Sequence, residues 1–129
     1  MSLAKTEKAM PKLLLIGGYP KGFRRPFHPS TKSGKILHDI LKRNNIKAEL
    51  IDLWNNKSEE KKGSVLPKKI DAILGYKDNG FTIIALGKYV HNCISRQMKS
   101  CTIHYLPHPA ARRSEHIRKL ESGLKQFAV

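Results

Sequence analysis

The sequence is poor in acidic residues, in cysteines and in long apolar segments, and each shortage excludes a class of protein. Aspartate and glutamate together number 10 against 25 lysines and arginines, which gives a formal net charge of +15. Repulsion at this charge destabilises a compact chain, so a polyanionic partner such as nucleic acid is expected; on charge alone, an acidic membrane surface would serve equally well. The apolar run at residues 13–16 is too short for a signal peptide, and no run reaches the ~20 residues of a membrane span.

The two cysteines, Cys93 and Cys101, are too few for a disulfide framework. They indicate a reducing intracellular setting, cytoplasm or nucleoid, and we interpret both as apolar core residues. His104 and His108 have the i, i+4 spacing of a helical metal pair, but the neighbouring prolines exclude a regular helix there. We therefore expect no metal site and no cofactor.

A chain of 129 residues suits a single domain, since it can bury roughly two-thirds of its unfolded surface. We expect residues 1–11 to be a flexible basic N-terminus and residues 12–129 to form the domain. DNA is the expected partner, with no membrane association and a monomeric state, and a protein partner is left open.

Apolar runs alternate with amphipathic stripes along the chain. The short apolar runs predict strands at 13–16, 48–53, 81–86 and 101–106. The stripes predict helices at 34–44, 67–74, 88–98 and 114–125. Ser33 and Ser114 are the expected N-caps of the first and last helix, and the polar segment 55–64 indicates either a disordered connection or a frayed helical turn. The alternation predicts an α/β fold, a three-layer α/β/α sandwich around a mostly parallel four-stranded sheet.

Ligands of parallel α/β sheets bind beyond the carboxyl ends of the strands. Four segments follow the predicted strands: GGYPKG, DLWNN, LGKYVHN and LPHPAARR. They should therefore meet at one edge of the sheet. The candidate site residues in and near these segments are Gly17, Gly18, Tyr19, Phe27, Asp52, Asn55 and His108.

Three segments carry motifs in a shared order: LLLIGGYPKGFRRPFHPSTKSGKILHDIL, FTIIALGKYV and YLPHPAARR. Together they resemble the uracil-DNA glycosylase superfamily, most of all a bacterial and archaeal branch with a Gly-Glu-x-Pro-Gly loop, then Arg-Pro-Phe and Ser-Gly. The second segment is similar to that family's central strand, and the third to its His-Pro-Ser or His-Pro-Ala loop. The resemblance covers most of residues 12–113, with a shorter middle, and implies a uracil-DNA glycosylase-like fold that binds DNA.

The resemblance also implies roles for particular residues. Glycosylases turn a nucleotide out of the duplex, stack its base on an aromatic ring and read its polar edge. In this sequence Phe27 would be the stacking ring, and Gly17 and Gly18 would let the backbone approach the base. His108 would donate a hydrogen bond to the base oxygen that gains negative charge. Each residue also has a purely structural interpretation, as a packing aromatic, a tight turn or a loop histidine.

Basic residues flank both of the motif loops. Their side chains would contact DNA phosphates, so that affinity falls steeply with salt. The residues concerned are Lys21, Arg24, Arg25, Arg112 and Arg113.

The first loop departs from the family because it holds no carboxylate. Gly18 and Tyr19 stand where many members place an acid, and a tyrosine with an ordinary pKa near 10 is a poor base at neutral pH. Asp52 or Asn55 could supply the missing polar group, or could simply cap their turn. The four cysteines that hold an iron–sulfur cluster in the similar branch are also missing, so no cluster is expected.

Three functions remain open. The first is an active DNA glycosylase, for uracil or for a modified base, with His108, Tyr19 and Asp52 as its catalytic residues. The second is a catalytically silent relative that holds DNA or a protein partner in the same cleft. The third is an unrelated α/β module that binds a nucleotide phosphate at GGYPKG.

Overall fold

The computed structural model describes residues 12–19, 27–29, 31–109 and 114–128, so the expected flexible segment 1–11 lies outside them. Four strands form one sheet in the order β3-β2-β4-β5, and every neighbouring pair is parallel. The strands are β2 (Leu13–Gly17), β3 (Glu49–Asp52), β4 (Thr82–Leu86) and β5 (His104–Leu106). The predicted α/β fold is confirmed, and the sheet is parallel throughout the described residues.

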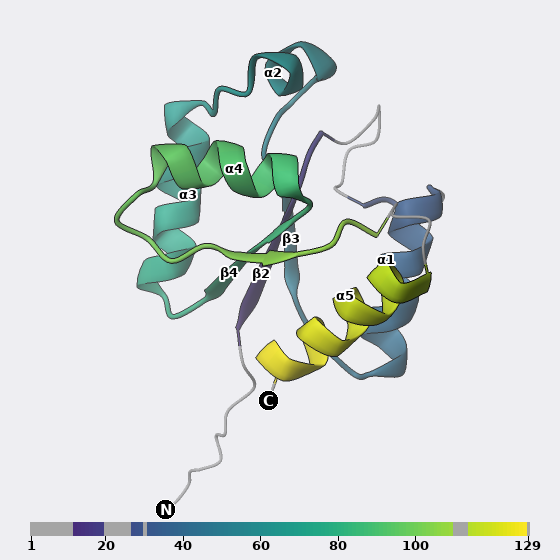
Figure 1. Ribbon diagram of the computed structural model, residues 1–129. Coiled ribbons are helices and arrows are strands. Elements are labelled where there is room, and N and C mark those ends of the chain that lie inside the picture. Colours follow the sequence, from purple (N-terminus) through teal and green to yellow (C-terminus); the bar gives the residue numbers. More distant parts are fainter. Residues whose placement is uncertain (1–11, 20–26, 30, 110–113, 129) are drawn as a thin grey trace, which may run out of the picture.

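Five helices accompany the strands of the described chain: α1 (Lys32–Arg43), α2 (Lys57–Lys62), α3 (Pro67–Asp78), α4 (Lys88–Gln97) and α5 (Ser114–Phe127). Figure 1 shows α1 and α5 on one side of the sheet, with α3 and α4 on the other. Helices on both faces bury the strands on both sides, which explains why the strand sequences are continuous apolar runs.

Alternate residues of β2 pack into different halves of the core. Leu13 and Leu15 contact the α1 and α5 side, where Leu37 and Leu120 are buried. Leu14 and Ile16 face the α3 and α4 side, in one cluster with the fully buried Trp54. The strand period of two therefore divides a single LLLI run between two layers of packing.

The first helix begins earlier than predicted, and its cap is Thr31 rather than Ser33. The Thr31 hydroxyl accepts a hydrogen bond from the Gly34 backbone N–H at 3.0 Å and donates to the His28 carbonyl at 2.7 Å. Thr31 has the extended backbone of an N-cap, whereas Ser33 already lies within the helix.

Three other boundaries differ from the prediction. Residues 57–62 form the short helix α2, with the Asn56 side chain as N-cap and Gly63 in the left-handed region as C-cap. Helix α3 runs through Gly75 to Asp78, and Asn79 caps it by donating to the Gly75 carbonyl. The last strand is confined to 104–106, because the Cys101 N–H turns back to the Met98 carbonyl.

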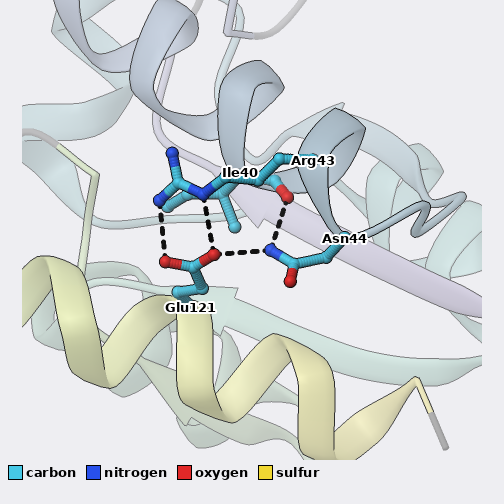
Figure 2. A network of polar contacts seen from close by, with 4 residues as sticks. All are labelled: Ile40, Arg43, Asn44 and Glu121. Carbon is cyan, nitrogen blue, oxygen red and sulfur yellow. Dashed lines mark hydrogen bonds and ion pairs between the residues drawn. The ribbon is translucent and has the colours of Figure 1, made fainter.

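A charged network joins the two helices on one face of the sheet. Figure 2 shows Arg43 and Asn44 at the end of α1 reaching toward Glu121 of α5. Arg43 donates twice to the Glu121 carboxylate, at 2.7 and 2.8 Å, and Asn44 donates at 2.6 Å. Hydrogen bonds from Arg43 and then Asn44 lower the pKa of Glu121 to about 2, so this carboxylate stays ionised over the working pH range.

Within the described ranges, no helix is both long and apolar enough to cross a membrane.

Candidate functional site

The two central strands mark the point where ligands bind in sheets of this type. The chain leaves β2 toward β3 on one side and leaves β4 toward β5 on the other, so the connections diverge between β2 and β4. A crevice forms at such a switch point, outside the carboxyl ends of the strands. Gly17 at the end of β2 pairs with Asp52 at the end of β3, which places both residues at this edge.

A small cavity of about 40 Å³ lies at the same edge. It includes six of the seven candidate residues, and Asn55 is the exception. Ligand sites for small molecules usually hold roughly 300 Å³ or more, so in this conformation the cavity has room for only a few waters. The described lining consists of Gly17, Gly18, Tyr19, Phe27, His28, Thr31, Ser33, Asp52 and His108.

Asn55 lies in the exposed turn that leads into α2 and does not line the cavity. Its backbone N–H donates to the Glu59 carboxylate at 3.1 Å, so its described contact belongs to the turn. The five proposed DNA-binding residues, Lys21, Arg24, Arg25, Arg112 and Arg113, lie outside the described residues.

Phe27 lines the cavity and has an unusual backbone conformation. Its φ of 51° lies in the left-handed region, which a bulky residue adopts only where its surroundings hold it. Its carbonyl accepts a hydrogen bond from His38 Nε2 at 2.9 Å. Its ring lies against Gly17, where a Cβ would come within 2.5 Å of the ring atom Cε2. Position 17 must therefore be glycine for the ring to sit at the end of β2.

His108 reaches the cavity from the loop after β5. Its ring centroid lies 5.7 Å from that of Phe27, with the ring planes tilted by 44°. Its Cβ lies 3.4 Å from where a Cβ of Gly87 would be, and Gly87 has a φ of 102°. The backbone N–H of Gly87 donates to the Leu106 carbonyl at 2.9 Å, which ties the ends of β4 and β5 together beneath the histidine.

Three lining residues were missed by the sequence analysis: His28, Thr31 and Ser33. All three belong to the segment that enters α1. A signal for them exists, because the hydroxyls of STKS mark the start of a helix that follows a strand-end loop. The N-cap of this helix is Thr31 and not the predicted Ser33, so Thr31 did not enter the list of candidate residues.

Asp52 is the carboxyl group of the cavity. Burial raises its pKa from 3.8 to about 6, and the positive charge of Lys69 only partly opposes this shift. Above pH 6 the group is a carboxylate that only accepts hydrogen bonds, and below pH 6 its neutral form both donates and accepts. The cavity therefore contains an aromatic ring, an imidazole and a carboxyl group whose charge changes near pH 6.

Replacing Asp52 with asparagine should stabilise the protein at neutral and alkaline pH. A pKa that rises on folding means that ionised Asp52 opposes folding, so the penalty is absent below about pH 4, grows to pH 6 and is constant above it. Allowing for solvent at this half-buried group, the gain in free energy of unfolding at pH 8 should be about 1–2 kcal/mol.

Urea denaturation at pH 4.5 and pH 8 would measure this effect. Asp71→Asn, on the exposed face of α3, is the matched control because it removes the same charge. An equal gain in both variants, or a gain for Asp52→Asn that is unchanged at pH 4.5, would contradict the assignment.

His104 and both cysteines have structural surroundings in this fold. The ring of His104 packs against Phe127 at 4.7 Å, whereas His108 faces Phe27, so the two imidazoles contact different neighbours. Cys93 is buried, Cys101 is half-buried, and both are free thiols. Among the residues that the structure describes, no group of three or more His, Cys, Asp or Glu side chains could hold a metal ion.

Acidic residues are distributed unevenly around the site. The sequence between Asp78 and Glu115 contains none, and this stretch includes β4, α4, β5 and the His108 loop. This stretch of the sequence therefore contributes basic and neutral side chains but no carboxylate.

Comparison of the chain with models of known protein families, with curated protein sequences and with solved structures found no match.

Proposed function

We propose that this protein binds DNA and receives a base turned out of the duplex at the cavity, in a uracil-DNA glycosylase-like version of the α/β/α sandwich. The observation that carries this proposal is that Phe27, His108 and Asp52, from three separate parts of the sequence, line one cavity at the switch point. Base-flipping enzymes need these chemical groups together: an aromatic face for stacking, and polar groups for the base edge.

The proposed reaction is hydrolysis of the N-glycosidic bond. The bond between the sugar C1′ and the base nitrogen breaks, and its electron pair leaves with the base. A His108 ring N–H donates a hydrogen bond to the base oxygen on which negative charge collects. Asp52 hydrogen-bonds the polar edge of the base, and Tyr19 closes the cavity beside Gly18. Water supplies the oxygen that bonds to C1′.

The small size of the cavity supports a second candidate function. At about 40 Å³, the site must widen before a base can enter. A protein that holds DNA through its basic surface without ever opening this cavity would be a catalytically silent binding module. Binding and base release therefore have to be measured separately.

The DNA-binding part of the proposal predicts a strong dependence on salt. If the five proposed arginines and lysines each neutralise one phosphate, affinity should fall about 500-fold between 50 and 200 mM salt. Fluorescence anisotropy with a labelled duplex and a labelled single strand would measure this decrease. Binding that is weak at 50 mM, or insensitive to salt, would contradict a DNA partner and favour a nucleotide-binding module.

A base-release assay separates the two remaining functions. Duplex and single-stranded oligonucleotides should contain uracil, hydroxymethyluracil, hypoxanthine or a thymine mismatch, with excess protein so that one turnover is followed. Abasic sites formed with any of these substrates would support the glycosylase. Salt-sensitive binding without abasic sites would support the silent module.

A further inference from the structure

A carboxylate from another part of the chain reaches the loop that lacks one. A Cβ built at Gly18 would lie 2.8 Å from Oε2 of Glu60 and 3.9 Å from the Trp54 ring. The Glu60 oxygen therefore occupies the space that a side chain at position 18 would need. Glycine at this position is what allows the carboxylate to rest against the loop.

The helix that carries Glu60 is fixed in place by two aromatic residues, the buried Trp54 and the partly exposed Tyr89. The indole N–H of Trp54, which is fully buried, donates to the Ser64 carbonyl at 2.8 Å just beyond α2. The Tyr89 hydroxyl donates to the backbone carbonyl of Glu60, and its ring lies 5.4 Å from that of Trp54. These contacts attach a six-residue helix to the core, so Glu60 is held against the loop.

The contacts made by Glu60 do not account for it as a structural residue. Glu59 accepts from the backbone of Asn55, and Glu121 is paired with Arg43. The Glu60 side chain is half-buried, yet within the described part of the chain it makes no hydrogen bond or ion pair. In a chain with 25 lysines and arginines against 10 acids, a half-buried carboxylate with no cation partner among the described residues is unexpected.

Glu60 and Asp52 approach the end of β2 from different elements. Asp52 lines the cavity from β3, where the base would lie, whereas Glu60 touches Gly18 from α2 and is not part of the lining. Glu60 therefore does not compete with the base for space. In the proposed complex Glu60 would act from outside the cavity, on the sugar side of the base.

We propose that Glu60 is the catalytic residue that accepts the proton of the attacking water, an inference that rests on the proposed base-release function. As the water oxygen bonds to C1′, one water proton passes to the Glu60 carboxylate. The C1′–N bond breaks, and its electron pair leaves with the base toward His108. Glu60 then returns its proton to solvent, so no further reactant is needed. Correctly positioned general bases contribute about 10²- to 10⁴-fold to such rates.

The test is single-turnover base release by the full chain with Glu60→Gln, together with anisotropy binding of the same oligonucleotides. We expect at least a 100-fold loss of rate with DNA affinity equal to or slightly above that of the wild type, because the variant removes a negative charge. Glu49→Gln, at the exposed first residue of β3, is the matched control and should keep the wild-type rate.

A second variant leaves the carboxylate intact. Gly18→Ala should push it aside, because the added Cβ would stand 2.8 Å from Oε2, and the rate should fall while thermal stability is largely kept. Wild-type base release with an undiminished rate in Glu60→Gln would overturn the role of Glu60 and leave the glycosylase function standing. DNA binding without base release by the wild type would overturn both. Loss of rate that is matched in Glu49→Gln would show a charge effect and would also overturn the role.

Discussion

Replacing His108 with alanine should lower the single-turnover rate of base release by about 10²- to 10³-fold. Removal of one prepositioned donor from a developing negative charge costs this much in enzymes that stabilise oxyanions. His108 lies beside Phe27 and over the end of β4, so its ring is positioned before the base arrives. DNA binding should change little, because most of that affinity comes from phosphate contacts. The measurement is the rate of abasic-site formation beside the dissociation constant for the same duplex.

His104→Ala is the matched control for this prediction. His104 lies four positions earlier, packs against Phe127 and does not line the cavity. It should retain base release within a few-fold after correction for any unfolded fraction. A His108→Ala variant as active as the wild type would remove the catalytic role, and equal losses in the two variants would indicate a general weakening of the β5 region.

Replacing Gly34 with alanine should destabilise the protein by about 3 kcal/mol. The added Cβ would stand 2.0 Å from the His28 carbonyl oxygen and 2.6 Å from that of Phe27. Both atoms belong to the backbone, so relief requires α1 to move away from the loop rather than a side chain to rotate. Overpacking of this kind usually costs 1–3 kcal/mol, and the upper end of this range is expected where two backbone atoms are involved. Chemical denaturation would measure the loss.

Gly75→Ala makes the same substitution within α3, where no atom lies within 4 Å of the added Cβ. Alanine has a higher helix propensity than glycine, so this variant should raise the free energy of unfolding by roughly 0.5–1 kcal/mol. Opposite signs for the two variants would establish that the approach of α1 to the loop, and not the loss of glycine as such, sets the cost. A Gly34→Ala variant of wild-type stability would contradict this packing.

Much of the fold could be predicted because its signals are local. The apolar runs LLLI and TIIAL and the amphipathic stripe of α1 are encoded within a few residues, and the α/β alternation follows from their order. Boundaries failed where the deciding interaction was a cap or a turn. Gly75 predicted the end of α3, but no atom lies within 4 Å of a Cβ built there, and the helix continues past it. The helix ends at Asn79, whose side chain donates to the Gly75 carbonyl.

The candidate site was predictable to the extent that it follows from topology. Parallel strands place Gly17, Asp52 and His108 at one edge whatever the details of packing. The approach of Glu60 to Gly18 could not be predicted, because it depends on how Trp54 and Tyr89 hold a short polar helix. Periodicity contains no information on such a tertiary contact, and the segment indicated only a disordered connection or a frayed helical turn.

The order of the strands also bears on the synthesis of the protein. Leu13 of β2 pairs with Thr82 of β4, a partner encoded 69 positions later. At a translation rate of 5–20 residues per second, the ribosome needs roughly 3 to 14 s to deliver that partner. For this time β2, the most apolar of the described strands, has no neighbour on its β4 side. Pairing between residues so distant in sequence also forms slowly. The nascent chain should therefore depend on holding chaperones, and a ribosome that stalls before β4 would leave an aggregation-prone product.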